Sequence, residues 1–315
     1  MFTIANSIKN AREKIKHLQN DGYAPSIGDI WSIKKVILLD YYMPEFKIIC
    51  SPKNKFSQWF YADPFCGSGL FSFEDKDLQN EYFPGSALMG AINGSEIGYT
   101  DCIFSENDEK NIESLNHRLK NSKHILKNRT FIAKKLDFEH GVDEILKIKK
   151  FGVAILVLID PAGYVPVKWT LMEKLLNEVG IDIILNFYTH RIAQNVSASK
   201  QNKGAETNLD DFFGDSNWKN YRVGITKKNL GQKLLQYYLN KVTRISGKTA
   251  ISIGVNKEGK NRLYDLIVIT RSPAGAKVIQ YGKKIMDDAT TESIKREFKV
   301  QTGQQMRLSD PKFIK

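Results

Sequence analysis

Each of four short β-like runs in this sequence ends in, or is soon followed by, an acidic side chain. In chain order the acids are Asp63, Glu106, Asp137 and Asp160, and the runs are residues 59–62, 99–104, 130–133 and 153–159. Ligands of an open parallel sheet bind at the carboxyl ends of its strands, where such side chains meet. Carboxylate oxygens there can accept hydrogen bonds from the hydroxyl or amino groups of a ligand. The pattern therefore predicts a ligand site at one edge of a sheet.

The first acid begins a glycine-rich segment directly after its strand. The segment consists of Asp63, Pro64, Phe65, Cys66, Gly67, Ser68 and Gly69. Its glycines permit a tight turn and let the backbone approach a ligand closely. It is not the dinucleotide-binding fingerprint, which would need a third glycine where Ser72 stands. Cys66 has no evident base beside it in the sequence, so we interpret it as part of the turn and not as a nucleophile.

The chain that must position these residues alternates between strand-like and helical segments. A helix is expected at 106–120, and a helical segment with Leu171, Leu175 and Leu176 leads to a fifth β-like run at 181–187. The fourth run is continuously apolar, as a central strand covered on both faces must be. The alternation predicts an α/β fold with a doubly wound, mostly parallel central sheet.

Two further β-rich runs lie in the last third of the chain. Residues 249–255 and 263–270 are joined by a hairpin-type connection at 256–261, and a helix is expected at 275–286. An antiparallel strand pair that closes a parallel sheet is the usual ending of a Rossmann-like methyltransferase, and not of a dehydrogenase. We therefore predict a Rossmann-like class I methyltransferase fold with an antiparallel C-terminal strand pair.

The predicted elements divide the chain into three parts. Residues 1–56 are predicted to form an N-terminal helical extension, 57–290 the Rossmann-like methyltransferase domain, and 291–315 a basic C-terminal tail. Inserts at 72–96 and 194–220 interrupt the domain and are expected to be long loops. Loops of this length are often mobile and functional, so the second insert could be a lid or a substrate-recognition segment.

Positive charge is concentrated near the C-terminus. The 315 residues carry a net charge of +12, and residues 219–315 hold 21 Lys and Arg against 7 Asp and Glu. The preceding 218 residues hold 26 basic and 28 acidic side chains, so the C-terminal third carries the whole excess. Such asymmetry points to a polyanion, most often nucleic acid. A lysine-rich genome with a solvated surface is an equally good explanation.

Composition also bears on the compartment and on metals. The longest apolar stretch, 153–159, is far too short to span a bilayer, and the N-terminus lacks the features of a secretory signal. Three cysteines suit a reducing compartment, so a soluble cytoplasmic protein without membrane contact is expected. The cysteines form no CxxC pair and the five histidines are scattered, so no metal site is expected.

The segment 63–69 closely resembles motif I of the S-adenosyl-L-methionine-dependent amino-methyltransferases that act on DNA and RNA bases. In that family the turn cradles the methionine part of the cofactor, an acid after the second strand binds the ribose hydroxyls, and an acid with an apolar neighbour after the third contacts the adenine. The resemblance implies that residues 63–69, Glu106 with Asn107, and Asp137 with Phe138 bind S-adenosyl-L-methionine. The alternatives are a helix cap at Glu106 and a turn residue at Asp137.

The end of the fourth run holds the candidate catalytic residues. The sequence Asp-Pro-Ala-Gly-Tyr at 160–164 resembles the Asp/Asn-Pro-Pro-aromatic motif of the same family, in which the acid and a backbone carbonyl orient the target amino group and the ring stacks on a flipped base. The resemblance implies catalytic roles for Asp160, Pro161 and Tyr164, although the aromatic residue here stands one position later. A Pro-Gly turn without a catalytic role is the alternative.

Two residues after the fifth run are candidates for binding substrate. His190 could act as a base, and Arg191 could bind a phosphate. A solvated strand end is the alternative for both.

A second resemblance covers residues 30–290, whose order of motifs is similar to that of the three-Cys-motif partner (TcmP) family. The matching features are a helix at 31–43, the segment 61–69, Gly85-Ser86-Ala87-Leu88, Glu106, Asp160-Pro161-Ala162-Gly163, Trp169-Thr170-Leu171, and the late strand 264–269 with Pro273-Ala274-Gly275. Family members more often show Asp-x-Phe-Ala-Gly-Pro-Gly at the first motif. The family occurs beside a three-Cys-motif protein that looks like a radical-SAM enzyme, so the resemblance implies such a protein as a possible partner.

Three functional hypotheses follow. The first is a methyltransferase that transfers a methyl group from S-adenosyl-L-methionine to an exocyclic amine of a nucleic-acid base, with the basic C-terminal third binding the nucleic acid. The second is a methyltransferase for a small molecule or a protein. The third is a non-catalytic module that binds the cofactor or a nucleotide within a complex.

Overall fold

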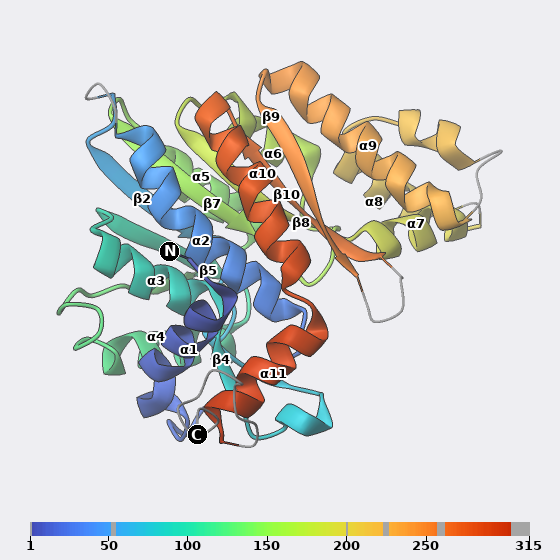
Figure 1. Ribbon diagram of the computed structural model, residues 1–315. Coiled ribbons are helices and arrows are strands. Elements are labelled where there is room, and N and C mark those ends of the chain that lie inside the picture. The colour runs from blue at the N-terminus through green and yellow to red at the C-terminus, as the bar shows by residue number, and fades with distance from the viewer. Residues whose placement is uncertain (1, 52–54, 200, 223–226, 257–261, 304–315) are drawn as a thin grey trace.

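A seven-stranded sheet forms the centre of the fold in this computed structural model, which describes residues 2–51, 55–199, 201–222, 227–256 and 262–303 (Figure 1). The strand order is β6-β5-β2-β7-β8-β10-β9. The strands are β2 (Gln58–Asp63), β5 (Asp101–Glu106), β6 (Ala133–Lys135), β7 (Val153–Ile159), β8 (Ile181–Phe187), β9 (Thr249–Asn256) and β10 (Arg262–Thr270). β10 is antiparallel to both neighbours, and the other neighbouring strands pair in parallel. The predicted sheet, mostly parallel with an antiparallel pair at its end, is confirmed.

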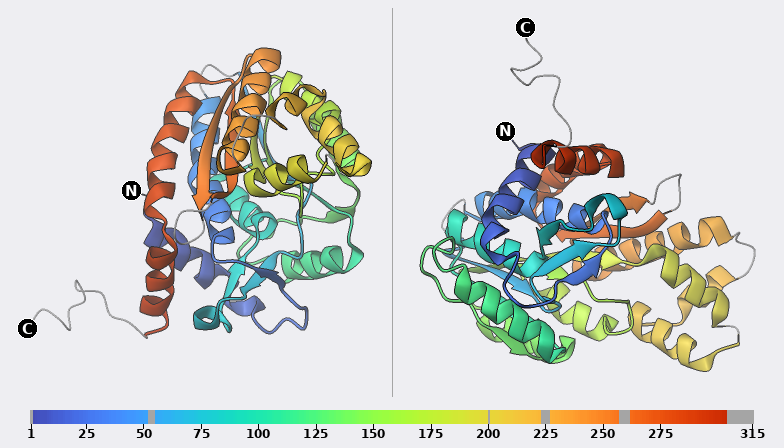
Figure 2. Two further views of the ribbon diagram at one scale, coloured as in Figure 1. Left: turned by 90° about the vertical axis from the view of Figure 1, so that its right-hand side faces the viewer. Right: turned by 90° about the horizontal axis from the view of Figure 1, so that it is seen from below.

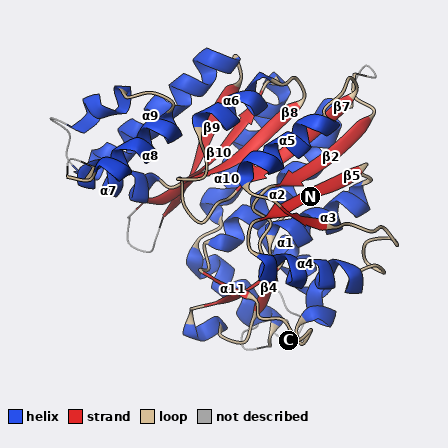
Figure 3. Ribbon diagram, turned by 180° about the vertical axis from the view of Figure 1, so that it is seen from behind, coloured by secondary structure: helices blue, strands red, loops and turns tan. Residues whose placement is uncertain are grey.

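Helices cover both faces of this sheet. α2 (Ser32–Cys50), α3 (Ser86–Ile97) and α10 (Pro273–Asp288) pack on one face (Figure 1), and α5 (Phe138–Ile148), α6 (Trp169–Asn177) and α9 (Lys227–Ser246) lie on the other (Figure 3). Successive side chains of β7 alternate between two separate apolar cores, one on each side of the sheet. Because β7 is buried on both faces, it needs the continuous apolar run that the sequence shows.

The strand order changes direction at β2, because β5 and β6 lie on one side of it and the later strands lie on the other. β5 pairs with one edge of β2 and β7 with the other. The connections on the two sides diverge at such a point and leave a crevice at the carboxyl ends of the strands. Asp63 ends β2, Glu106 ends β5, and Asp160 directly follows β7, so this topology brings all three to the same edge.

A smaller sheet lies beside the glycine-rich turn. Its order is β1-β3-β4, with β1 (Ser26–Gly28), β3 (Leu70–Phe73) and β4 (Tyr82–Pro84). β3 begins directly after the turn and pairs in parallel with β1 and antiparallel with β4. The N-terminal segment is therefore hydrogen-bonded to the strand that leaves the turn.

The first and last helices pack against each other. α1 (Ile4–Ile15) contacts α11 (Thr291–Gln301) (Figure 2). Nη1 of Arg12 donates to Oε1 of Gln301 at 2.7 Å, and its guanidinium lies 4.5 Å from the ring centre of Phe298. Residues 291–301 of the predicted tail thus form a helix held on the fold, and 304–315 lie outside the described residues.

Several segments differ from the local expectations. The third strand is 133–135 and not 130–133, and residues 1–56, which were expected to be helical, include the strand β1. Residues 72–96 contain β4 and the crossover helix α3, so they are not a loop. Residues 194–220 are mostly helical, in α7 (Thr189–Ala198), α8 (Lys203–Phe213) and a 3-10 helix (Asn217–Arg222).

Aromatic burial explains why residues 194–220 fold. Phe212, Phe213 and Trp218 are almost fully buried, and the ring of Phe212 stacks on Tyr238 of α9 at a centroid distance of 5.2 Å. Each large ring removes much apolar surface from water, which outweighs the polar character of the rest of the segment. None of the helices in the described residues is long and apolar enough to cross a membrane.

Candidate cofactor and substrate site

Three adjoining cavities open at the carboxyl ends of β2, β5 and β7. The first, which we call the main cleft, has a volume of about 460 Å³ and is lined among others by Phe65, Gly67, Glu106, Asp137, Asp160 and Pro161. The second, the turn cavity of about 180 Å³, also contacts Phe65, Gly67 and Asp160. The third, the side cavity of about 380 Å³, is lined among others by Ala162, Asn186, Tyr188, His190 and Arg191. Lys35 of α2 lines all three cavities, so they adjoin at this side chain.

The two glycines of the turn serve different purposes. Both have positive φ angles, +59° at Gly67 and +87° at Gly69, which side chains rarely adopt. A Cβ atom at Gly67 would meet no protein atom within 4 Å, because this residue faces the open cleft. A Cβ atom at Gly69 would lie 2.8 Å from Cδ1 of Leu115 in α4 (Glu109–Asn121), because this residue packs inward. Gly67 therefore leaves space for a ligand against the backbone.

Glu106 joins the turn to the end of β5. Its Oε2 accepts a hydrogen bond from the backbone N–H of Gly67 at 3.1 Å, and its Oε1 accepts from the N–H groups of Asn107 and Asp108 at 2.8 and 3.1 Å. A carboxylate offers about four acceptor positions, so one remains on Oε2. The side chain lines the main cleft, and this position can accept a ligand hydroxyl. The neighbouring Asp108, and not Glu106, caps α4.

Asp63 is buried beneath the turn and does not face the cleft. Its carboxylate accepts hydrogen bonds from the Ser86 hydroxyl at 2.6 Å, from the Tyr61 hydroxyl at 3.2 Å and from the backbone N–H of Phe65 at 3.1 Å. Burial raises the pKa of Asp63 to about 7. Its contacts are those of a residue that shapes the start of the turn and ties it to α3.

Cys66 and Ser68 are also buried within the turn. Burial, with the carboxylates of Asp63 and Glu106 nearby, raises the pKa of the Cys66 thiol well above its usual value. The thiol is therefore protonated and poorly nucleophilic at neutral pH, which agrees with a structural role. The hydroxyl of Ser68 donates to the carbonyl of Leu70 at 2.9 Å and lies 2.9 Å from the Ser26 hydroxyl.

Asp137 and Phe138 line the main cleft next to the turn. Oδ1 of Asp137 accepts from the backbone N–H of His140 at 2.9 Å, so Asp137 is the N-cap of α5. This hydrogen bond, with a second from the His140 ring, lowers the pKa of Asp137. The ring of Phe138 stacks on Phe65 of the turn at 5.0 Å. The two rings form an apolar wall next to an exposed carboxylate.

Asp160 is held by two side chains that its motif does not contain. Its Oδ2 forms an ion pair with Nζ of Lys35 from α2, and its Oδ1 accepts from Nδ2 of Asn186 near the end of β8 at 2.6 Å. Lys35 and Asn186 are functional candidates that the sequence did not reveal. Their signal is weak, because a lysine on a helix and an asparagine in an apolar strand show no partner until the chain is folded.

Backbone carbonyls after Asp160 are engaged by the segment that follows β8. The Tyr188 hydroxyl donates to the carbonyl of Pro161, and Nη1 of Arg191 donates to the carbonyl of Ala162 at 2.9 Å. The guanidinium of Arg191 also lies 5.6 Å from the ring centre of Tyr188. His190 and Arg191 are exposed and line the side cavity, so the structure brings them to the same site as Asp160.

Tyr164 lies in the core, and this corrects the expectation that its ring is free to stack on a base. The residue is 5% exposed, and its ring packs edge-on against Phe212 of α8 at 5.2 Å. The aromatic cluster of α8 offers this ring more apolar contact than the open cleft does. The aromatic residue that lines both the main cleft and the side cavity is Tyr188.

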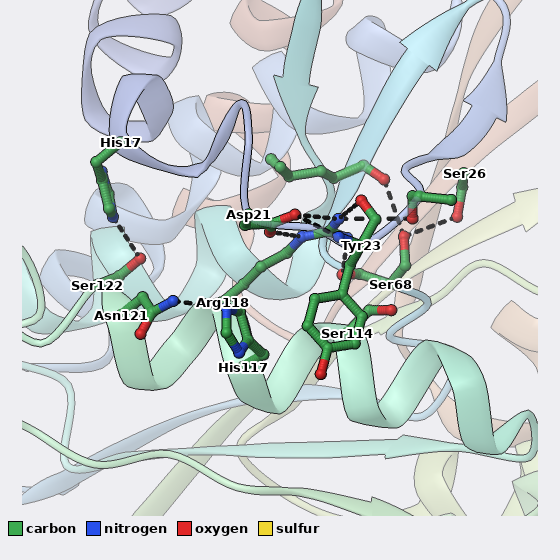
Figure 4. A network of polar contacts seen from close by, with 12 residues as sticks. His17, Asp21, Tyr23, Ser26, Ser68, Ser114, His117, Arg118, Asn121 and Ser122 are labelled. Atoms are coloured by element: carbon green, nitrogen blue, oxygen red, sulfur yellow. Dashed lines mark hydrogen bonds and ion pairs between the residues drawn. The ribbon is translucent and has the colours of Figure 1, made fainter.

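A buried arginine, Arg118 of α4, fixes the turn from behind (Figure 4). Its Nη1 donates to the carbonyl of Ser68 at 2.6 Å, its Nε to the carboxylate of Asp21 at 2.7 Å, and its Nη2 to the carbonyl of Tyr23 at 2.7 Å. The turn and the N-terminal segment before β1 are therefore held by one guanidinium. The sequence does contain one indication of this role: Arg118 stands three positions after Leu115, on the apolar face of its helix.

No protein-family model and no curated protein matches this chain. Among solved structures, the chain is similar to protein LPL1258 of Legionella pneumophila, described as family DUF519, with 12% identity and a TM-score of 0.44 over 80% of this chain and 93% of that one. It is also similar to the methyltransferase domain of the bacterial protein CtHen1, with 12% identity and a TM-score of 0.35 over 73% and 99%. At TM-scores below 0.5 these likenesses add nothing to what the strand order and the cleft indicate. Membership of the three-Cys-motif partner family stays a prediction.

Proposed function

We propose that this chain is an S-adenosyl-L-methionine-dependent methyltransferase that acts on an exocyclic amine of a nucleic-acid base. The observation that carries the proposal is the bond between the Gly67 N–H and the Glu106 carboxylate on the wall of a cleft that also holds Asp160. A glycine backbone, an acid and a stacked aromatic pair at the switch point of a parallel sheet suit a nucleoside with a charged tail.

The residues of the cleft fit this cofactor. Gly67 leaves open space against the backbone, as a closely bound methionine chain requires. Glu106 has an acceptor position left for a ribose hydroxyl, and Phe138 with Phe65 offers an apolar surface for an adenine ring. Asn107 and Asp137 lie on the same wall. We assign the cofactor to the main cleft on these grounds.

Methyl transfer asks mainly for alignment at this site. When bound, the cofactor supplies a methyl group that is already activated as a sulfonium. Asp160 can accept an N–H of the substrate amine and orient its lone pair, while Lys35 and Asn186 hold the carboxylate in place. The Tyr188 hydroxyl donates to the Pro161 carbonyl and so helps to hold the backbone beside Asp160 in place. Together these residues would orient the substrate amine for methyl transfer.

Calorimetric titration with S-adenosylhomocysteine tests the cofactor assignment. We expect wild-type protein to bind with micromolar affinity and Glu106→Ala to bind at least about tenfold more weakly, because a charge-assisted hydrogen bond contributes about 1.5–3 kcal/mol. Glu109→Ala is the matched control, since this exposed acid of α4 pairs with Lys135 and does not line the cleft.

Folded wild-type protein that does not bind the ligand, or Glu106→Ala that binds like wild type, would overturn the assignment. Where binding holds, labelled S-adenosyl-L-methionine with DNA and RNA oligonucleotides tests the reaction. Asp160→Ala is then expected to abolish methylation while S-adenosylhomocysteine still binds.

A further inference from the structure

Asn186 carries a buried polar atom without a partner at the candidate site. The residue is 4% exposed, and its Nδ2 donates to Asp160, but its Oδ1 is buried and accepts no hydrogen bond within the described parts of the chain. The reverse orientation of the amide would place its oxygen against a carboxylate, so the observed one is favoured. A buried acceptor that lacks a donor is costly, and such a group at a cavity wall marks a place where a ligand can supply one.

Other acceptors next to Asp160 are already engaged. The carbonyl of Pro161 accepts from Tyr188, and the carbonyl of Ala162 accepts from Arg191. Each of these carbonyls has one of its two acceptor positions filled, whereas the oxygen of Asn186 has neither filled. The oxygen of Asn186, whose amide nitrogen lies 2.6 Å from Asp160, is therefore the acceptor that gains most from a second N–H of an amino group held by Asp160.

Two cationic side chains line the cavity beside Asn186. They are Arg191 and Lys35, of which Lys35 also pairs with Asp160, and the cavity is lined as well by His190 and by the acids Asp29 and Glu74. Asp29 is engaged by the indole N–H of Trp31 at 3.0 Å. A guanidinium has five N–H donors, and Arg191 uses Nη1 for the Ala162 carbonyl, so its other donors can bind a phosphate.

We infer that the side cavity binds the methyl acceptor as a nucleotide unit. Oδ1 of Asn186 accepts an N–H of the base amino group, and Arg191 with Lys35 binds the phosphate. This inference rests on the proposed function and adds the substrate contacts to it. The phosphate can belong to a free nucleotide or to a nucleic acid, because both present the same group to Arg191.

Nucleotide titrations, with and without S-adenosylhomocysteine, test this inference. The probes are AMP and CMP, which carry a base amine and a phosphate, then adenosine and cytidine, which lack the phosphate, and purine riboside 5′-monophosphate and UMP, which lack the amine. We expect AMP, CMP or both to bind, and each missing group to weaken that binding about tenfold, as the loss of one charge-assisted hydrogen bond does. A short single-stranded oligonucleotide that binds more tightly than any mononucleotide would identify nucleic acid as the source of the phosphate, and equal affinities would identify the free nucleotide.

Two variants separate the contacts. Asn186→Leu is expected to erase the difference between amine-bearing and amine-free probes, and Arg191→Gln the difference between nucleotide and nucleoside. Asn93→Leu is the matched control for the first, because Asn93 is 3% exposed and its Nδ2 donates to Asp40 at 3.0 Å, away from the cavities. Arg271→Gln, an exposed arginine that donates to the Ser246 carbonyl, is the control for the second.

The outcomes distinguish this inference from the proposed function. If neither AMP nor CMP binds, or if both site variants discriminate the probes as wild type does, the inference is overturned even where S-adenosylhomocysteine binds. If S-adenosylhomocysteine fails to bind but the nucleotide pattern is observed, the proposed function falls and the nucleotide site stands. Should Asn186→Leu fail to fold, as judged by circular dichroism, the exposed Arg191→Gln decides.

Discussion

The hydrogen bonds of single residues show that side chains assigned to the ligand also hold the glycine-rich turn in shape. Glu106 presents an acceptor to the cleft while it binds three backbone N–H groups. Asp63, which the motif resemblance places with the cofactor, is covered by Tyr61 and Ser86 and acts from behind the turn. Substituting either residue will therefore change the shape of the turn as well as any direct contact.

The buried carboxyl of Asp63 is expected to make stability depend on pH. Its pKa rises from 3.8 to about 7 on folding, so the folded protein holds a proton that the unfolded chain releases. The stabilisation is complete below pH 3.8 and is lost as pH rises through 7, by about 3 kcal/mol between pH 5 and pH 8. Asp63→Asn cannot release this proton, and its amide oxygen can still accept from the Phe65 N–H.

Urea unfolding at pH 5, 6, 7 and 8 checks this prediction. The free energy of unfolding of Asp63→Asn relative to wild type should rise with pH by the amount given above. Asp211→Asn, a change at an exposed aspartate, serves as the control and should follow wild type. A constant difference between Asp63→Asn and wild type across the range would contradict the buried-proton explanation.

At the scale of elements, the site is assembled by parts of the chain that lie far apart in the sequence. α2 contributes Lys35 to the carboxylate after β7, and α4 contributes Arg118 to the turn after β2. β1 pairs with β3, so the N-terminal segment is a wall of the site and not only an extension. The turn keeps its conformation because a helix and a strand from elsewhere hold it.

Arg118→Met is expected to weaken both folding and cofactor binding. The change leaves the Asp21 carboxylate, whose side chain is 4% exposed, without its guanidinium partner. Breaking a buried ion pair of this kind costs about 3–5 kcal/mol. Loss of the bond to the Ser68 carbonyl should also loosen the turn and reduce affinity for S-adenosylhomocysteine.

Arg129→Met separates the two effects. Arg129 also donates to backbone carbonyls, those of Tyr99 and Thr100 at 2.8 and 2.6 Å, but it does not contact the turn. Its loss should lower stability in urea and leave the affinity of the folded protein for S-adenosylhomocysteine unchanged. Arg118→Met that retains full affinity under conditions where it is folded would show that the turn holds its shape without this tether.

For the whole molecule, folding neutralises part of the C-terminal charge excess. Lys241 pairs with Asp215 and Lys295 with Asp75, both acids from outside that region, and the buried Lys248 donates to the carbonyl of Ile181. What remains exposed is spread over α10 and its neighbours, including Lys277, Lys283 and Lys284 of α10. The interaction of the basic third with nucleic acid stays a prediction.

Reversing the charge of α10 tests that prediction. The triple change Lys277→Glu, Lys283→Glu and Lys284→Glu should weaken binding to a single-stranded oligonucleotide and lower the salt slope by about 2, since each phosphate contact contributes roughly 0.7. Fluorescence anisotropy over a range of salt concentrations measures both. The control triple Lys110→Glu, Lys120→Glu and Lys123→Glu changes three exposed lysines on and beside α4. If the two triples reduce binding equally, the C-terminal third has no special role.

Local patterns in the sequence determined the sheet and the part of the site that follows its strands. The runs at 153–159 and 181–187 are strands with those bounds, because a strand buried on both faces must be apolar throughout. The glycine-rich turn, Glu106 at the end of β5 and Asp160 after β7 come together because parallel strands end at one edge. These features depend on residues that are close together in the sequence, so the sequence alone predicts them.

Tertiary structure alone decided which side chains complete the site. Lys35, Arg118 and Asn186 act through partners between 26 and 125 residues away, so no local pattern marks them. Tyr164 follows a motif that predicts an exposed ring, yet the aromatic residues of α8 draw it into the core. Whether a side chain is buried depends on the whole packed fold. A tyrosine ring can lie in the core or at a ligand site, and the surrounding elements decide where apolar surface is available for it.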